Sequence, residues 1–201
     1  MKTKVSLWTM TVMLAASSAA FCGTVTGTLQ TPNGQAIKNA TLDFNLEQAG
    51  LLAGSGSIVP VTASCYTSAD GSVVGLPNPL SGPVATADTG AGSLAGGIYY
   101  VETTFYSASL GGGETLPSPE LRIQLSSTGS LLVNSPVPFP AGAAGMRVYI
   151  GSASGGETLQ GQTSGTAQFA QTSALIAGTT APAANSTACS VDFNDTIIPY
   201  S

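Results

Sequence analysis

The sequence predicts an all-β protein, and three observations lead to this class. Apolar residues recur at every second position far more often than at the helical period of 3.6 residues. Glycine (25) and proline (12) are spread along the 201 residues, so few windows of about twelve residues lack a helix breaker. Hydrophobic residues make up 43% of the chain and charged residues only 7%, which favours a folded core over disorder.

The first twenty residues have the layout of a secretory signal peptide. Lys2 and Lys4 precede an apolar run over residues 5–16, and the small residues Ser18-Ala19-Ala20 end the segment. We expect cleavage after Ala20, so that residues 1–20 are removed. No later run reaches the roughly 18 apolar residues that a membrane span needs. The sequence therefore predicts a secreted, extracellular or cell-surface protein without a membrane span.

The charge of the mature chain excludes one class of partner. After cleavage only Lys38, Arg122 and Arg147 face ten acidic residues, which gives a net charge of −7. Three basic side chains cannot neutralise a phosphate backbone, so nucleic acid is not an expected partner. The polarity comes instead from serine, threonine, glycine, asparagine and glutamine, a mixture that suits extracellular β-domains.

The mature chain opens with a predicted hairpin. Residues 24–30 form the first strand, Asn33-Gly34 supplies the turn, and the chain returns through residues 36–47. The return strand alternates in polarity, and the side chains expected on its buried face are Leu42, Phe44 and Leu46. Residues 58–67 read as one further strand, followed by a turn at residues 68–72.

Two proline-rich stretches mark predicted domain junctions. Residues 75–83 hold three prolines, which preclude a central strand there, and residues 177–187 are rich in proline, alanine and threonine. The strands predicted between these stretches cover residues 97–107, 120–125, 130–134 and 146–151. We expect one domain over residues 84–184 and another over residues 21–83 together with 185–201.

The predicted strand at residues 97–107 carries a third of the aromatic Phe and Tyr side chains of the chain. Alternation places Val101 and Phe105 toward a core, while Tyr100, Glu102 and Tyr106 lie on the opposite, wetter face. Exposed aromatic residues of this kind serve carbohydrate-binding modules. Tyr100, Glu102 and Tyr106 are therefore the candidate binding face.

Two segments resemble known families of β-sandwich domains. Residues 23–46 are similar to the start of carboxypeptidase-regulatory-like and transthyretin-like modules. The residues at matching places are Gly23, Val25, Gly27, Gly34, Ala36 and Ala40. Residues of about 84–180 look like a fibronectin type III-like domain. "GGIYYVETTFYSASLGGGETLPSPE" resembles its F strand, F–G loop and G strand, and "PAGAAGMRVYIGSASGGETL" its C strand with flanking turns.

These resemblances imply two antiparallel β-sandwich domains of the immunoglobulin-like or fibronectin type III-like class, and no activity. The F-like segment precedes the C-like one, the reverse of the usual order. Either the domain is a permuted sandwich or it is a relative with the same hairpins.

The three cysteines leave one unpaired. Cys65 and Cys189 lie in extended segments, whereas Cys22 is close to the expected mature N-terminus, and chain ends are commonly disordered. We therefore favour a Cys65–Cys189 disulfide, which would make the middle domain an insertion in the first. The alternative is a Cys22–Cys65 bond confined to the N-terminal domain, with Cys189 free for an intermolecular bridge.

Few residues of the chain are suited to catalysis. The chain has no histidine, which removes Ser-His-Asp and Cys-His catalysis and imidazole zinc sites. Glu114 and Glu120 could form a carboxylate pair for glycoside hydrolysis, but we interpret them as solvated hairpin charges. The oxygen-bearing Asp192, Asn194 and Asp195 lack the glycine and distal glutamate of a calcium loop. We expect no enzyme activity, no cofactor and no metal.

The motif Gly-Gly-Glu-Thr-Leu occurs twice, at residues 112–116 and 155–159. Each copy follows an aromatic strand, and glycine tolerates the positive φ of a sharp reversal. We interpret the two copies as turn chemistry rather than as a paired binding motif.

These observations predict a secreted, non-catalytic β-sandwich protein that is a structural, adhesive or assembly component of the cell exterior and could form filaments. Its expected partners are other protein subunits, including copies of itself, or cell-surface components. The alternative is a carbohydrate-binding module that holds a glycan on Tyr100 and Tyr106. A virion appendage protein and a hydrolase rank below both.

Overall fold

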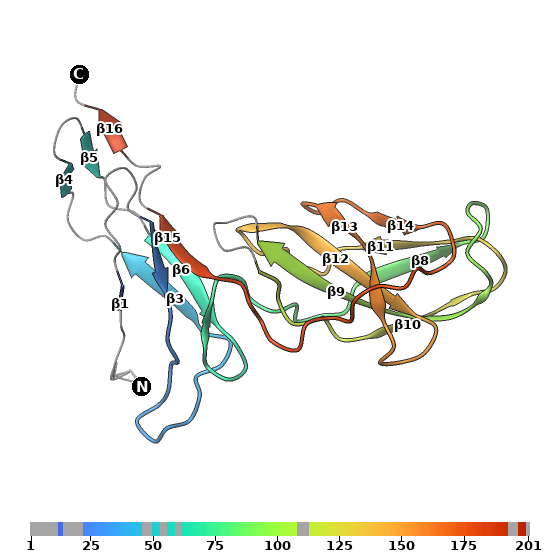
Figure 1. Ribbon diagram of the computed structural model, residues 1–201, viewed down its shortest axis with the longest axis horizontal. Coiled ribbons are helices and arrows are strands. Elements are labelled where there is room, and N and C mark those ends of the chain that lie inside the picture. Colours follow the sequence, from blue (N-terminus) through green and yellow to red (C-terminus); the bar gives the residue numbers. More distant parts are fainter. Residues whose placement is uncertain are drawn as a thin grey trace. The chain divides into compact units, whose positions relative to one another are not determined.

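The computed structural model describes residues 12–13, 22–45, 50–52, 56–58, 62–107, 113–192 and 197–199. Within these residues there is no helix, and every strand pairing is antiparallel, which confirms the predicted all-β class. The chain divides into two compact units, Met1–Pro77 with Ala188–Ser201, and Asn78–Thr187 (Figure 1). Both divisions fall at or beside the proline-rich stretches.

The described part of the first unit contains three sheets of three strands each, paired in the orders β1-β2-β15, β3-β6-β7 and β16-β5-β4. The strands are β1 (Val12–Met13), β2 (Cys22–Val25), β3 (Thr41–Asn45), β4 (Gly50–Leu52), β5 (Gly56–Ile58), β6 (Thr62–Thr67), β7 (Val73–Val74), β15 (Cys189–Asp192) and β16 (Ile197–Pro199).

The predicted first hairpin is wrong in its pairing. The Asn33-Gly34 turn is present, with Gly34 at a φ of 78°, but its two arms meet only in one bridge, between Gln30 and Ala36. Asn39 then takes a left-handed φ of 52° and its N–H donates to the Thr67 carbonyl, so that β3 pairs with β6. The predicted single strand at residues 58–67 is likewise two strands, β5 and β6, and residues 59–61 lie outside the described residues.

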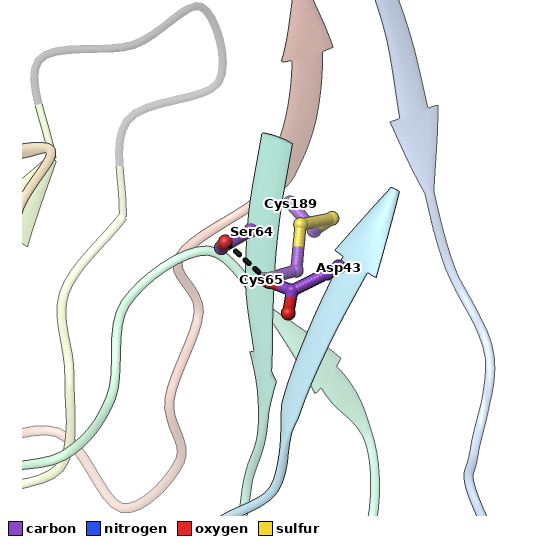
Figure 2. The surroundings of a disulfide bond; sticks show 4 residues. All are labelled: Asp43, Ser64, Cys65 and Cys189. Atoms are coloured by element: carbon purple, nitrogen blue, oxygen red, sulfur yellow. Dashed lines mark hydrogen bonds between the residues drawn. A yellow bond between two sulfur atoms is a disulfide. The ribbon is translucent and has the colours of Figure 1, made fainter. Parts of the chain in front are cut away.

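A disulfide lies in the core of the first unit. Cys65 of β6 and Cys189 of β15 are bonded, with their Cα atoms 5.7 Å apart (Figure 2). Both side chains are buried together with Val25. The partly buried side chains that pack against this group are Leu42, Phe44 and Val73. The bond links two sheets of the unit, and it is the pairing that the sequence favoured.

Alternation around the disulfide follows the sequence pattern. Ser64, the neighbour of Cys65 on β6, is exposed, and its hydroxyl donates to the Asp43 carboxylate over 2.6 Å (Figure 2). Ser64 and Asp43 are opposite each other in the β3–β6 register. One face of this sheet is therefore apolar and covalently linked, and the other is polar.

Outside residues 108–112, which are not described, the second unit contains two sheets, with strand orders β10-β9-β12-β13 and β14-β11-β8. The strands are β8 (Val84–Asp88), β9 (Gly97–Ser107), β10 (Leu121–Leu125), β11 (Ser130–Asn134), β12 (Ala143–Gly151), β13 (Thr158–Ser164) and β14 (Phe169–Gln171). β8, β13 and β14 were not predicted from the sequence, because they are rich in threonine, alanine and glutamine and show no clear apolar alternation.

Both sheets of the second unit contribute to its buried residues. On β9, Val101 and Phe105 are 0% and 1% exposed, as the alternation predicted. The Phe105 ring meets the edge of Phe139 at a centroid distance of 5.4 Å. The other fully buried aliphatic side chains of β11 and β12 are Leu131, Val133, Met146, Val148 and Ile150.

Candidate functional site

The face of β9 opposite its core side chains holds the candidate residues predicted from the sequence. We call this surface the polar face. It consists of Tyr100, Glu102, Thr104 and Tyr106 of β9, with Arg147 and Tyr149 of the adjacent β12. Tyr100, Glu102 and Tyr106 are half-buried, whereas Thr104 and Tyr149 are fully buried. The middle of this face is therefore less solvated than the alternation predicted.

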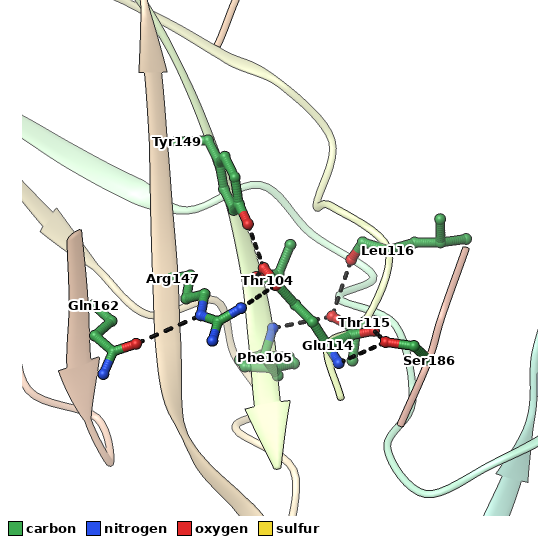
Figure 3. Close-up of polar contacts among 9 residues, drawn as sticks. All are labelled: Thr104, Phe105, Glu114, Thr115, Leu116, Arg147, Tyr149, Gln162 and Ser186. Atoms are coloured by element: carbon green, nitrogen blue, oxygen red, sulfur yellow. Dashed lines mark hydrogen bonds and ion pairs between the residues drawn. The ribbon is translucent and has the colours of Figure 1, made fainter. Parts of the chain in front are cut away.

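Glu114 is not on β9 or β12, but its carboxylate binds three residues of the polar face (Figure 3). One of its carboxylate oxygens accepts hydrogen bonds from the hydroxyls of Thr104 and Tyr149, and the other accepts an ion-paired bond from Arg147. The interpretation of Glu114 as a solvated hairpin charge is wrong, because the residue is only 8% exposed. Buried carboxylates are expensive unless they are paired and hydrogen-bonded, and Glu114 is both.

The backbone that carries Glu114 is fixed from two sides. Residues 113–118 run beside β9, where Thr115 N–H donates to the Phe105 carbonyl over 2.9 Å. On the other side, Ser186 N–H donates to the Glu114 carbonyl, and Glu114 N–H donates to the Ser186 hydroxyl. Gly113 has a φ of 102°, and a Cβ there would lie 2.3 Å from the Ser186 carbonyl oxygen. Only glycine permits this approach.

Tyr106 is also engaged. The Arg147 guanidinium lies over its ring, 5.5 Å from the centroid, and its hydroxyl donates to the Thr163 carbonyl over 3.0 Å. A Cβ at Gly145 would lie 2.9 Å from the Tyr106 ring and 1.8 Å from the Thr163 oxygen, so a glycine is required beneath the ring. One face of Tyr106 is thus occupied by a cation within the protein.

The surroundings of Glu114 leave little for acid–base chemistry. Burial, together with the hydrogen bond to the Glu114 carboxylate, raises the pKa of Tyr149. A tyrosine with a raised pKa that already donates its proton is a poor general acid or nucleophile at neutral pH. The network of Thr104, Glu114, Arg147 and Tyr149 is therefore suited to holding β9, β12 and residues 113–118 together.

A second group of acidic residues lies at the Glu102 end of the polar face. Glu102, Glu120 and Glu157 each place a carboxylate oxygen within 4.8 Å of the others, and we call them the carboxylate cluster. Glu102 comes from β9, Glu120 directly precedes β10, and Glu157 directly precedes β13. The backbone N–H of Gly155 donates to both Glu120 and Glu157, at 3.1 and 3.2 Å.

The cluster changes the acidity of its members in different directions. Burial raises the pKa of Glu157, and its neighbour Glu120 raises it further. Burial also raises the pKa of Glu102, with smaller contributions from the carboxylates of Glu157 and Glu120. At Glu120 desolvation acts to raise the pKa, but hydrogen bonds from Ser154, Glu157 and Gly155 outweigh it and lower the pKa. The cluster therefore favours a shared proton.

The chemistry of these oxygens is that of a hard-cation donor set. Carboxylates are the ligands that Ca²⁺ and Mg²⁺ take in proteins, and a bound cation would offset the same repulsion that a proton offsets. Among the described residues, Glu102, Glu120 and Glu157 are the group with this spacing. Asp192 lies on β15 in the other unit, and Asn194 and Asp195 are outside the described residues.

The structure regroups the residues proposed from the sequence. Glu114 and Glu120, considered as a pair, belong to separate networks. Glu102 of the candidate binding face joins Glu120 and the unforeseen Glu157. The sequence did hold one signal, because both copies of Gly-Gly-Glu-Thr-Leu bury their glutamate. Glu114 and Glu157 are 8% and 5% exposed.

We expect Glu157→Gln to raise the melting temperature at pH 7.5 and to leave it nearly unchanged at pH 4.5. The pKa of Glu157 is higher in the folded chain than in the unfolded chain, so ionisation above the folded pKa costs stability. As the pH falls through the folded pKa, the wild-type protein regains that stability. Thermal unfolding followed by circular dichroism at both pH values measures the difference. An equal shift at both would contradict the shared-proton interpretation.

A different result is expected for Glu114→Gln. The substitution removes the charge that Arg147 requires and weakens the acceptor for Thr104 and Tyr149. The free energy of unfolding should fall by about 1 to 3 kcal/mol, because Arg147 is partly solvated and is not left wholly buried. Denaturant unfolding measures this loss. The matched control is Glu120→Gln, for which we expect a smaller loss, since Glu120 is exposed and its carboxylate accepts hydrogen bonds from Ser154 and Gly155 rather than an ion pair.

No protein-family model, curated protein or solved structure matches this chain. Its function is therefore inferred from the fold, the disulfide and the polar face.

Proposed function

We propose that this chain is a secreted, non-catalytic protein of β-sandwich domains that acts as a structural, adhesive or assembly component of the cell exterior. The observation that carries the proposal is the saturation of Glu114. Its carboxylate is buried and committed to Thr104, Arg147 and Tyr149. A buried carboxylate whose oxygens are all committed to internal bonds supports a rigid scaffold around Glu114 rather than a reactive centre there.

The strand orders support a sandwich of the fibronectin type III-like class with a permuted chain. Immunoglobulin-like sandwiches place strands G, F and C side by side, extended by C′. If β9 is the F-like and β12 the C-like strand, the order β10-β9-β12-β13 reads G-F-C-C′. The F-like strand comes first in the chain. We propose this permutation for residues 84–184, and a carboxypeptidase-regulatory-like sandwich for residues 21–83 with 185–201.

Export is supported by the disulfide and by the leader. Disulfides persist in oxidising compartments and are rare in the cytosol, and Cys65–Cys189 lies in the core of the first unit. Among the described residues, no helix is long and apolar enough to cross a membrane. We propose that residues 1–20 direct export and are then removed.

One experiment addresses location and role together. Native material is fractionated, its N-terminus is sequenced, and the mature protein is examined by size-exclusion chromatography and negative-stain microscopy. We expect an N-terminus at Phe21 in the extracellular or surface fraction, and assemblies with itself or other subunits. Recovery of intact Met1 from the cytosol would overturn the proposal.

The glycan-binding alternative receives less support from the geometry. Tyr106 lies against Arg147 and donates its hydroxyl within the chain, so it is not a free platform. Tyr100 is half-buried on the same strand. Retention of a monomeric mature protein on insoluble glycans, lost in Tyr100→Ala, would favour this alternative over assembly.

A further inference from the structure

The leader contributes a strand to the first unit. β1 (Val12–Met13) lies antiparallel to β2 (Cys22–Val25), with Val12 opposite Val25 and Met13 opposite Thr24. On its other edge β2 pairs with β15 over its full length. In the order β1-β2-β15, residues 12–13 of the predicted signal peptide therefore cover one edge of β2 at Thr24 and Val25.

Removal of the leader changes that edge. Cleavage after Ala20 takes β1 away and leaves β2 as the outermost strand of its sheet. The backbone N–H and C=O groups that faced β1 then have no partner in the order that the structure gives. Unpaired edges of this kind recruit extended segments by strand addition.

β2 is short, with four residues, but it lacks two other features that protect exposed edges. Its sequence, Cys-Gly-Thr-Val, contains no charge and no proline, which are the usual blocks to edge pairing. Two copies of this strand do not repel each other. The strand can also pair with itself, because antiparallel pairing about a two-fold axis presents the same edge from both copies.

We propose that cleavage of the leader uncovers the β2 edge and that this edge pairs, antiparallel, with the β2 edge of a second copy of the chain. The partner takes the place that β1 holds in the precursor. The proposal rests on the proposed export and cleavage, and it names one surface through which the mature protein assembles. The resulting sheet has the order β15-β2-β2-β15 across the two copies.

Proline substitutions test the edge directly. Consecutive N–H groups along a strand point to opposite edges, so Gly23→Pro and Thr24→Pro remove one N–H that faces β15 and one that faces the open edge. The variant that stays folded, with the wild-type circular dichroism spectrum, identifies the open edge. Light scattering after size exclusion should show a dimer for the mature wild type and a monomer for that variant. If both variants unfold, a soluble peptide carrying residues 10–15 should convert the wild-type dimer to a monomer, and a scrambled peptide should not.

Cross-linking gives an independent readout. Cys22 begins β2 and has no cysteine partner within the chain, since Cys65 and Cys189 bond each other. A bifunctional maleimide should trap the mature wild type as a dimer and fail with Cys22→Ser. A monomeric mature protein, or a dimer that survives in the folded proline variant and with the peptide, would overturn the proposal. If the protein in the surface fraction begins at Phe21 and is bound to other subunits, that result would support the proposed function but not this interface.

Discussion

The double substitution Cys65→Ser with Cys189→Ser should lower the free energy of unfolding of the first unit by about 2 to 5 kcal/mol. The bond joins residues separated by 124 positions, and the chain-entropy model assigns about 5 kcal/mol to a loop of that length. The two sulfurs are also buried beside Val25, so serine hydroxyls would replace apolar contacts.

Hydrogen exchange followed by mass spectrometry measures this effect unit by unit. We expect faster exchange in β2, β6 and β15 and unchanged exchange in β9 and β12, because the second unit has its own core. Cys22→Ser is the matched control and should leave exchange unchanged. Equal loss of protection in both units would show that they unfold together.

The second large effect is expected for Phe105→Ala. Phe105 is 1% exposed and packs edge-on against Phe139, so its truncation should cost about 3 to 5 kcal/mol. Tyr100→Ala removes an aromatic ring of similar size from the opposite face of the same strand. Because Tyr100 is half-buried, it should cost markedly less. Urea unfolding of both variants decides the matter, and equal midpoints would mean that the faces of β9 are reversed.

The repeated motif shows how a correct local interpretation can miss a site. Gly113 and Gly155 both have positive φ, so the glycines do serve sharp reversals. The glutamate that follows is nevertheless buried in each copy, one paired with Arg147 and the other placed beside Glu102 and Glu120. The turn residues could be predicted because a positive φ depends mainly on the residue type at that position. The residues that contact the two glutamates come from other strands, so the spacing of residues in the sequence could not predict them.

The two carboxyl networks differ in the groups that surround their carboxylates. Glu114 is matched by one guanidinium and two hydroxyl donors, whereas Glu102, Glu120 and Glu157 face one another. The first network is held together by one ion pair and two hydrogen bonds. In the second network, a proton on one carboxylate reduces the repulsion among the three. We therefore expect Glu114→Gln to lower the stability at neutral pH and Glu157→Gln to raise it.

The sequence by itself determined the all-β class, the buried face of β9 and the parity of the cysteines. Period-two alternation reports which side of a strand is apolar, and glycine and proline report where strands cannot continue. Val101 and Phe105 are buried for that reason. The tertiary structure alone decided which strands are neighbours. β3 lies beside β6 rather than beside the strand predicted at residues 24–30, and residues 113–118 lie beside β9. Alternation specifies faces but not edges, and edge pairing depends on contacts between residues distant in the chain. The burial of Glu114 and the meeting of Glu102, Glu120 and Glu157 follow from those pairings, so only the folded chain could place them.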